Sequence, residues 1–251
     1  MALHPVLLSL VGTIFVLLLW HLVVVFGVVN PLLLPSPLMV AAVFVDAETL
    51  QGLLHDALFT VSRAFSGFGL GGVSGVAIGM IVGFFRPIYA LLEFLIEFCR
   101  SLPAAALLPA FMLFLGIGDA SKVALVAFSC SLVMLVQTAA GVKARNATRT
   151  MVAQILGATK LQIFRKVILP EILPAVATGL RISISLALII TLVAEMLLST
   201  DRGLGRTILD MQLLFKTPQM YAAIILTGAL GYSANKVISI IAEQLIHWEG
   251  K

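Results

Sequence analysis

Long apolar stretches alternate with short polar ones along most of this 251-residue chain. A helix needs about 20 apolar residues to cross a hydrocarbon core about 30 Å thick. We predict six membrane-spanning helices, at 7–29, 64–85, 88–116, 122–142, 172–198 and 220–246. The apolar residues do not alternate with polar ones at a period of two, which excludes a transmembrane barrel. The sequence therefore predicts an all-α polytopic membrane protein, with residues 1–251 forming one transmembrane domain.

The composition agrees with this pattern. Hydrophobic residues make up 61% of the chain and charged residues only 11%, whereas a soluble domain carries roughly 25% charged residues. The mean hydropathy is +1.12. An ordinary soluble protein is therefore excluded.

The distribution of charge predicts an orientation. Between the fourth and fifth predicted spans the basic residues are Lys143, Arg145, Arg149, Lys160, Arg165 and Lys166. The segment 30–58 is acidic instead. Because positively charged loops stay in the cytoplasm, we predict cytoplasmic termini and an external segment 30–58. The segment 199–219 carries Arg202, Arg206 and Lys216 and is an exception to the rule. The net charge of +4 follows from these loops, so we expect no nucleic-acid partner.

Glycine recurs every four residues along the second predicted span, at Gly67, Gly71, Gly75, Gly79 and Gly83. Small residues at this spacing form a stripe against which another helix backbone can lie closely. We predict that this stripe packs against another span.

The third predicted span contains its most polar stretch at 93–109, "EFLIEFCRSLPAAALLP". Glu93, Glu97 and Arg100 lie on neighbouring turns and can pair along one face. Pro103 and Pro109 each remove a backbone hydrogen bond, and opened backbone at bilayer depth requires cover by protein or a water-filled cavity. Two interpretations remain open. The break lines a translocation path, with Glu97, Arg100, Ser101 and Pro103 as path residues, or it is a kink with an ion pair needed for packing.

Two further charged residues lie within the fifth predicted span. Arg181 is about two turns from the cytoplasmic end, and Glu195 is near the outer end, facing either a lumen or interfacial water. Asn235 and Lys236 lie midway along the sixth span. Such residues either bind a transported solute or pair structurally with one another.

Residues 150–168 predict a short helix on the inner face of the membrane. Met151, Val152, Ile155 and Leu156 share one side by helical spacing, and Leu161, Phe164 and Ile168 repeat the pattern after Gly157. This apolar side should pack against lipid headgroups or a partner's groove. Gly157 breaks the segment. We expect Pro170 to turn Leu169 away from the helix and end the element, and Pro174 to lie in the first turn of the next span.

The chain contains neither G-x-x-x-x-G-K-[ST] nor H-E-x-x-H. We therefore expect no ATP site, no metal site and no enzymatic activity in this chain. Cys99 and Cys130 fall inside predicted spans without metal-type spacing and are interpreted as packing residues.

The segment 151–170 resembles the EAA signature of binding-protein-dependent ABC importer permeases. Ala153 matches its second alanine, Gly157 its glycine, and Leu169-Pro170 its terminal pair, whereas Met151 stands at the glutamate position. Other matching segments follow in the family's order: "LPSP" at 34–37, "RSLPAAALLP" at 100–109, "FLGIGDASK" at 114–122, "LPEILPAVATGLRISI" at 169–184, "VAEML" at 193–197 and "RGLG" at 202–205. They are similar to the nitrate/sulfonate/taurine branch of that family.

The resemblance implies a type I ABC importer permease fold in the bacterial inner membrane. It implies a homodimer of permeases, two cytoplasmic ATPases that bind ATP and Mg, and an extracytoplasmic solute-binding protein. A coupling helix at about 151–165 would dock on the ATPase. The coupling residues implied are Ala153, Gly157, Ala158, Leu161, Phe164, Leu169 and Pro170. The solute implied is a small anion such as a sulfonate, taurine or nitrate.

Two other classes of membrane protein are alternatives. An ion-gradient-driven carrier or channel often has paired broken spans in its two halves, but the break at 93–109 has no clear counterpart in the second half. A membrane scaffold without transport activity would not need a polar broken span.

Overall fold

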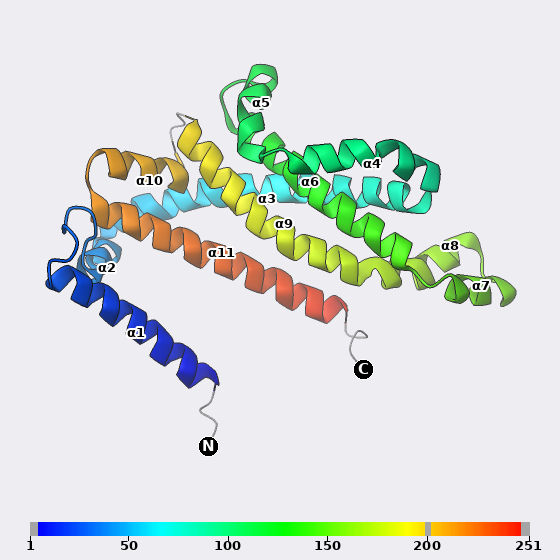
Figure 1. Cartoon of the computed structure of the whole chain (residues 1–251), viewed down its shortest axis with the longest axis horizontal. Coiled ribbons are helices and arrows are strands. Elements are labelled where there is room, and N and C mark those ends of the chain that lie inside the picture. The colour runs from blue at the N-terminus through cyan, green and yellow to red at the C-terminus, as the bar shows by residue number, and fades with distance from the viewer. Residues whose placement is uncertain (1–4, 199–201, 247–251) are drawn as a thin grey trace.

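The computed structural model describes residues 5–198 and 202–246, and these residues are helical except for short connections (Figure 1). The elements in chain order are α1 (Pro5–Val25), α2 (Pro37–Val45), α3 (Ala47–Phe84), α4 (Arg86–Ser101), a 3₁₀ turn (Ala104–Leu107), α5 (Leu108–Leu115), α6 (Asp119–Ala144), α7 (Ala147–Ile155), α8 (Lys160–Ile163), a π-turn (Phe164–Ile168), α9 (Leu169–Leu197), α10 (Leu204–Leu213) and α11 (Thr217–Leu245). The predicted all-α fold is confirmed for the described residues.

Five helices are long and apolar enough to cross a membrane, and a bent pair formed by α4 and Ala104–Leu115 supplies a sixth crossing if it counts as one span. This agrees with the six predicted spans. The largest difference in boundaries is at α3, which begins at Ala47 instead of residue 64. The apolar pattern did not predict this extension, because the residues before 64 include polar ones. A helix can continue beyond the hydrocarbon core with polar side chains.

Side-chain caps explain where the outer helices begin. Ser36 accepts a hydrogen bond from the Met39 N–H and precedes Pro37 at the start of α2, a favourable position for proline. Asp46 accepts one from the Thr49 N–H at the start of α3. Hydrogen bonds from the hydroxyl and backbone of Thr49 hold the pKa of Asp46 below its usual range.

The predicted glycine stripe packs directly against α6. A Cβ atom added at Gly75 would lie 2.5 Å from the carbonyl oxygen of Ser131, and one added at Gly79 would lie 2.6 Å from that of Leu135. Real Cβ atoms do not approach so closely, so the two backbones touch only because these positions lack side chains. The prediction is confirmed, and it explains why α3 and α6 form the centre of the fold.

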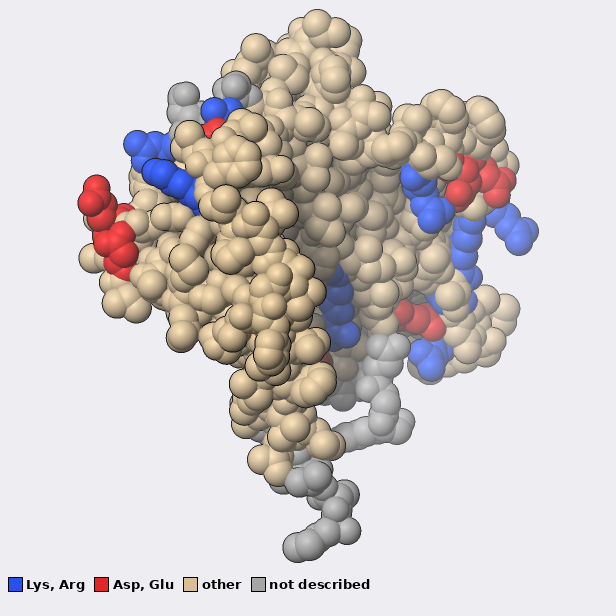
Figure 2. All heavy atoms as spheres, turned by 60° about the vertical axis from the view of Figure 1, so that its left-hand side comes forward, with Lys and Arg blue, Asp and Glu red and all other residues tan. Residues whose placement is uncertain are grey.

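The helices α3, α6 and α9 surround a core that includes Val126, Cys130 and Ile184. The helix α1 lies at the edge (Figure 1), where Trp20 donates a hydrogen bond to the carbonyl oxygen of Pro35. Figure 1 places α10 at one end of the molecule and α7 with α8 at the opposite end. We call these the outer and inner ends, after the orientation that the charge distribution predicts. Most of the face in Figure 2 is uncharged, with charged side chains gathered mainly at its two sides.

Candidate functional site

The predicted break in the third span is present. The helix α4 ends at Ser101, whose hydroxyl donates to the carbonyl oxygen of Glu97, and the chain bends by 96° before α5. Pro103 lies in this bend with an extended backbone. Pro109 lies in the first turn of α5, where a backbone N–H would have no helical partner anyway. The expectation of a second opened bond at Pro109 is therefore wrong.

The pair formed by Glu97 and Arg100 confirms the predicted contact along α4. Arg100 Nη1 lies 2.8 Å from Glu97 Oε1, and both side chains are about half exposed. Arg100 also lines a cavity of about 200 Å³ together with Phe128 and Ser129 of α6 and Leu186 of α9. An aqueous solute in this cavity would meet the guanidinium group directly.

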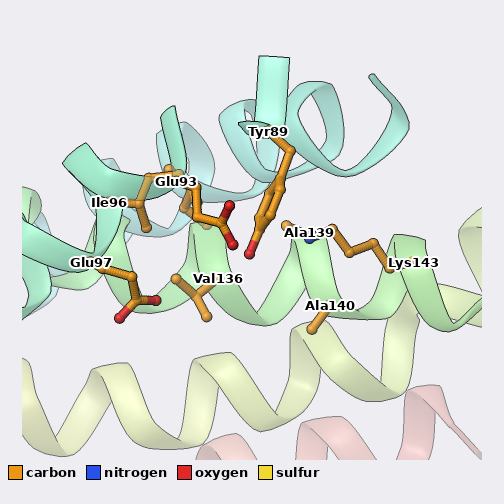
Figure 3. A pocket seen from close by; sticks show the side chains of 9 residues that line it. Tyr89, Glu93, Ile96, Glu97, Val136, Ala139, Ala140 and Lys143 are labelled. Carbon is orange, nitrogen blue, oxygen red and sulfur yellow. The ribbon is translucent and has the colours of Figure 1, made fainter. Parts of the chain in front are cut away.

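A second cavity, of about 120 Å³, lies between α4 and α6 (Figure 3). Tyr89, Glu93 and Glu97 of α4 point into it from one side, and Lys143 of α6 lies over the Tyr89 ring. Ile88, Leu92 and Ile96 of α4 pack against Leu135 and Ala139 of α6, so Glu93 and Glu97 lie beside an apolar contact between the two helices.

Arg181 is separate from these residues of α4. Its guanidinium lies 4.0 Å from Glu243 of α11, and both side chains are exposed. Asn235 of α11 donates a hydrogen bond to Ser185 of α9 at 2.8 Å. Among the described residues these polar groups connect α9 with α11, so Asn235 acts as a helix contact.

Glu195 faces neither a lumen nor interfacial water. Its side chain is 0% exposed, and it is held by Arg63 Nη1 at 2.6 Å, the Thr60 hydroxyl at 2.9 Å and the Gly205 N–H at 3.0 Å. The sequence-based placement of Glu195 is therefore wrong for this conformation. Its partners lie far away in the chain, and only the packing of α3 and α9 brings them together.

Sequence reasoning missed Arg63 as a functional residue. It lies one residue before the predicted span 64–85 and was not among the charged residues considered within the spans. A signal was present, because Arg63 precedes Gly67 by four residues and so continues the face that packs on α6. Its Nε donates to Asp119 at 2.7 Å, and Nη1 donates to the carbonyl oxygen of Arg202 at 2.8 Å.

At the inner end, the predicted helical segment is divided into the two helices α7 and α8. The helix α7 ends at Ile155, and Gly157 just beyond it has a φ of +79°. The Gly157 N–H donates to the carbonyl oxygen of Gln154, and the Ala158 N–H donates to that of Ala153, the paired bonds of a Schellman motif. Thr159 and Gln162 then form a capping box that starts α8. The break predicted at Gly157 is confirmed.

The helix does not end at Pro170 as predicted. Leu169 has helical dihedral angles, α9 begins there, and the preceding residues 164–168 form a π-turn. The wider turn makes room for the proline ring, which would crowd a regular helical turn. Because α9 starts early, Pro174 lies inside it and not in its first turn.

The apolar residues of this segment divide into two groups. Ala153, Ala158, Phe164 and Leu169 pack against a buried cluster that includes Val142 and Ile172. A second group stays exposed by 49–80%: Met151, Val152, Ile155, Leu156 and Leu161. One part of the predicted apolar side therefore packs within the chain, and the exposed part is the surface available to a partner.

Glu171 anchors α7 to α9. Its Oε1 accepts a hydrogen bond from the Asn146 N–H at 2.9 Å and lies 3.4 Å from Arg149 Nη1. The first turn of α7 is thus held by a carboxylate at the start of the span that follows. Sequence reasoning missed this contact, since the two residues are in different elements.

A family model described as the inner membrane component of binding-protein-dependent transport systems matches residues 75–247. The chain belongs to this family. It is the membrane-spanning permease subunit of an ABC importer, as the sequence resemblance predicted.

Two relatives match the permease over nearly its whole length. It is 29% identical over 247 residues to the taurine transport system permease protein TauC of Escherichia coli, covering 96% of this chain and 90% of that protein. It is 28% identical over 233 residues to the putative aliphatic sulfonates transport permease protein SsuC of Bacillus subtilis, covering 93% of this chain and 84% of that protein.

The fold of the permease is also that of solved ABC importers. A chain of the MetNI methionine ABC transporter, described as inward facing, matches with a TM-score of 0.70 at 18% identity. The match covers 80% of this chain and 99% of that chain. The predicted type I importer fold is confirmed.

Proposed function

We propose that this permease imports a small anion and is driven by separate ATPases that dock on its α7–α8 segment. The observation that carries the proposal is the exposed apolar group at the inner end, where Ile155 and Leu156 are 79% and 80% exposed. The Schellman motif and Glu171 fix the ends of the helix that carries these side chains. A fixed apolar helix face of this kind fits a groove on a partner protein.

The rest of the assembly follows from this docking. Two permease copies would form the path, and two ATPases with ATP and Mg would each receive one α7–α8 segment. A binding protein would deliver solute to the outer end, with both termini of the permease in the cytoplasm. ATP can drive the cycle only by favouring one conformation of the permease over another. The α7–α8 segment is continuous with α9. A movement of the docked segment would therefore be transmitted along α9 toward the outer end.

A substitution on α7 tests the docking. We expect Ile155→Asp to lower ATP-driven uptake at least about tenfold, since burying a carboxylate in an apolar groove costs well over 1.4 kcal/mol. Uptake is measured in liposomes that contain the permease, its ATPase and its binding protein, with MgATP and radiolabelled taurine, an alkanesulfonate or bicarbonate. The control is Gln154→Asp, which adds the same charge to a neighbouring exposed position. Equal uptake by the two variants contradicts the docking.

The proposed solute is an anion because Arg100 lines the cavity at the broken span. A guanidinium group binds carboxylate or sulfonate oxygens through paired hydrogen bonds, and a solute anion could replace Glu97 as its partner. The relatives named for taurine and aliphatic sulfonates match more than nine-tenths of this chain.

We expect Arg100→Ala to weaken uptake of the anionic solute by about tenfold, the equivalent of one charge-assisted hydrogen bond. The measurement is the concentration dependence of uptake in the same liposomes. Arg86→Ala is the control, because Arg86 is an exposed arginine at the other end of α4. An unchanged rate and solute preference in Arg100→Ala would remove Arg100 from the path.

A further inference from the structure

Lys122 is the least satisfied charged group in the described part of the permease. Its side chain is 0% exposed, and its Nζ has no hydrogen-bond partner. The nearest carboxylate oxygen with which it forms an ion pair belongs to Asp119, at 3.6 Å. A buried ammonium without hydrogen bonds is costly, so its presence requires an explanation.

The surrounding charges are paired unevenly. Arg63 holds both carboxylates, Glu195 at 2.6 Å and Asp119 at 2.7 Å. Lys122 belongs to the same cluster through Asp119, which Arg63 also holds, yet Lys122 holds neither carboxylate at hydrogen-bonding distance. Two cations and two carboxylates could instead pair one to one, with Arg63 keeping Asp119 and Lys122 taking Glu195. The cluster therefore has two alternative pairings, and this conformation shows one of them.

The two pairings differ in how the outer ends of three helices are joined. Arg63 lies on α3, Lys122 on α6 and Glu195 on α9. In the observed pairing, Glu195 joins α9 to α3 and also holds the turn before α10 through the Gly205 N–H. In the other pairing, Glu195 would join α9 to α6. The glycine stripe holds α3 and α6 together, so the helix that changes partner is α9.

We propose that Arg63, Lys122 and Glu195 form an ion-pair switch at the outer end, in which Glu195 passes from Arg63 to Lys122 when α9 shifts relative to α3 during transport. This inference rests on the proposed function, because the α7–α8 segment lies at the inner end of the same helix. Packed interfaces move between discrete arrangements more readily than they deform continuously. Lys122, as a second cation beside Arg63, gives Glu195 a partner in both arrangements.

Lys122→Met separates a switch from a static contact. Methionine has a similar length and removes an ammonium that makes no hydrogen bond in this conformation. We expect the variant to insert and to be at least as heat-resistant as the natural protein, while ATP-driven uptake falls about tenfold, as a shift of about 1.4 kcal/mol in the switch would cause. Unchanged uptake overturns the switch. Absent uptake by the unsubstituted permease overturns the proposed function instead.

A cross-link provides a measurement that does not depend on Lys122. The Thr207 hydroxyl of α10 donates to Asp56 of α3 at 2.6 Å, so the side chains at these two positions meet, and cysteines are placed there to tie α10 to α3 through a disulfide. Cys99 and Cys130 are first replaced by alanine. We expect oxidation of Asp56→Cys/Thr207→Cys to reduce uptake about tenfold and reduction to restore it, whereas oxidation leaves each single-cysteine variant unchanged. Equal uptake by the oxidised and reduced double variant overturns the switch.

Discussion

Replacing Gly75 with leucine is expected to cost about 3 kcal/mol of folding stability, at the upper end of what overpacking usually costs. The added Cβ would lie 2.5 Å from the Ser131 carbonyl oxygen and 2.6 Å from the Met134 Cβ. Neither neighbour is the flexible end of a side chain, so α3 and α6 must move apart. Their separation would also disturb the neighbouring contacts along the stripe.

The measurement is thermal unfolding of the purified permease in detergent, together with the yield of inserted protein. Gly69→Leu is the matched control, because Gly69 lies on the same helix with no atom within 4 Å of an added Cβ. Leucine also favours a helix more than glycine does, so the control should keep its stability. If both variants unfold at the same temperature, close contact between α3 and α6 is not what the glycines provide.

Replacing Gly157 with glutamate is expected to uncouple the ATPase from transport while the permease remains inserted. Gly157 has a φ of +79° and open space around it. A non-glycine residue in this conformation costs roughly 1–2 kcal/mol, and the bulky charge would stand beside the exposed side chains of Ile155 and Leu156. We therefore expect ATP-driven uptake to fall at least about tenfold.

The control must carry the same backbone strain elsewhere. Gly27 has a φ of +66°, also with open space around it, and lies after α1 at the outer end. Gly27→Glu should lose similar stability and keep its uptake. The readouts are uptake and ATP hydrolysis by the assembled transporter. Undiminished ATP-driven uptake in Gly157→Glu would refute docking at this segment.

Local patterns were sufficient where a property depends on neighbouring residues. The glycine spacing predicted the α3–α6 contact, Pro103 predicted the broken span, and Gly157 predicted the break after α7. Each is a local feature of backbone or helix geometry. The error at Pro170 has the opposite origin, because the π-turn before it is stabilised by packing of Ile163 and Ile168 in the buried cluster.

The sequence by itself determined that this chain is an all-α membrane protein, where its spans lie and which family it resembles. These properties follow from hydrophobic length and short motifs, which need no long-range contact. Only the tertiary structure decided that Glu195 is enclosed by Arg63 and Thr60, 132 and 135 residues away. It also decided which half of the α7–α8 apolar residues stays exposed. The physical reason is that a buried charge is defined by what surrounds it, and helices far apart in the chain supply those surroundings.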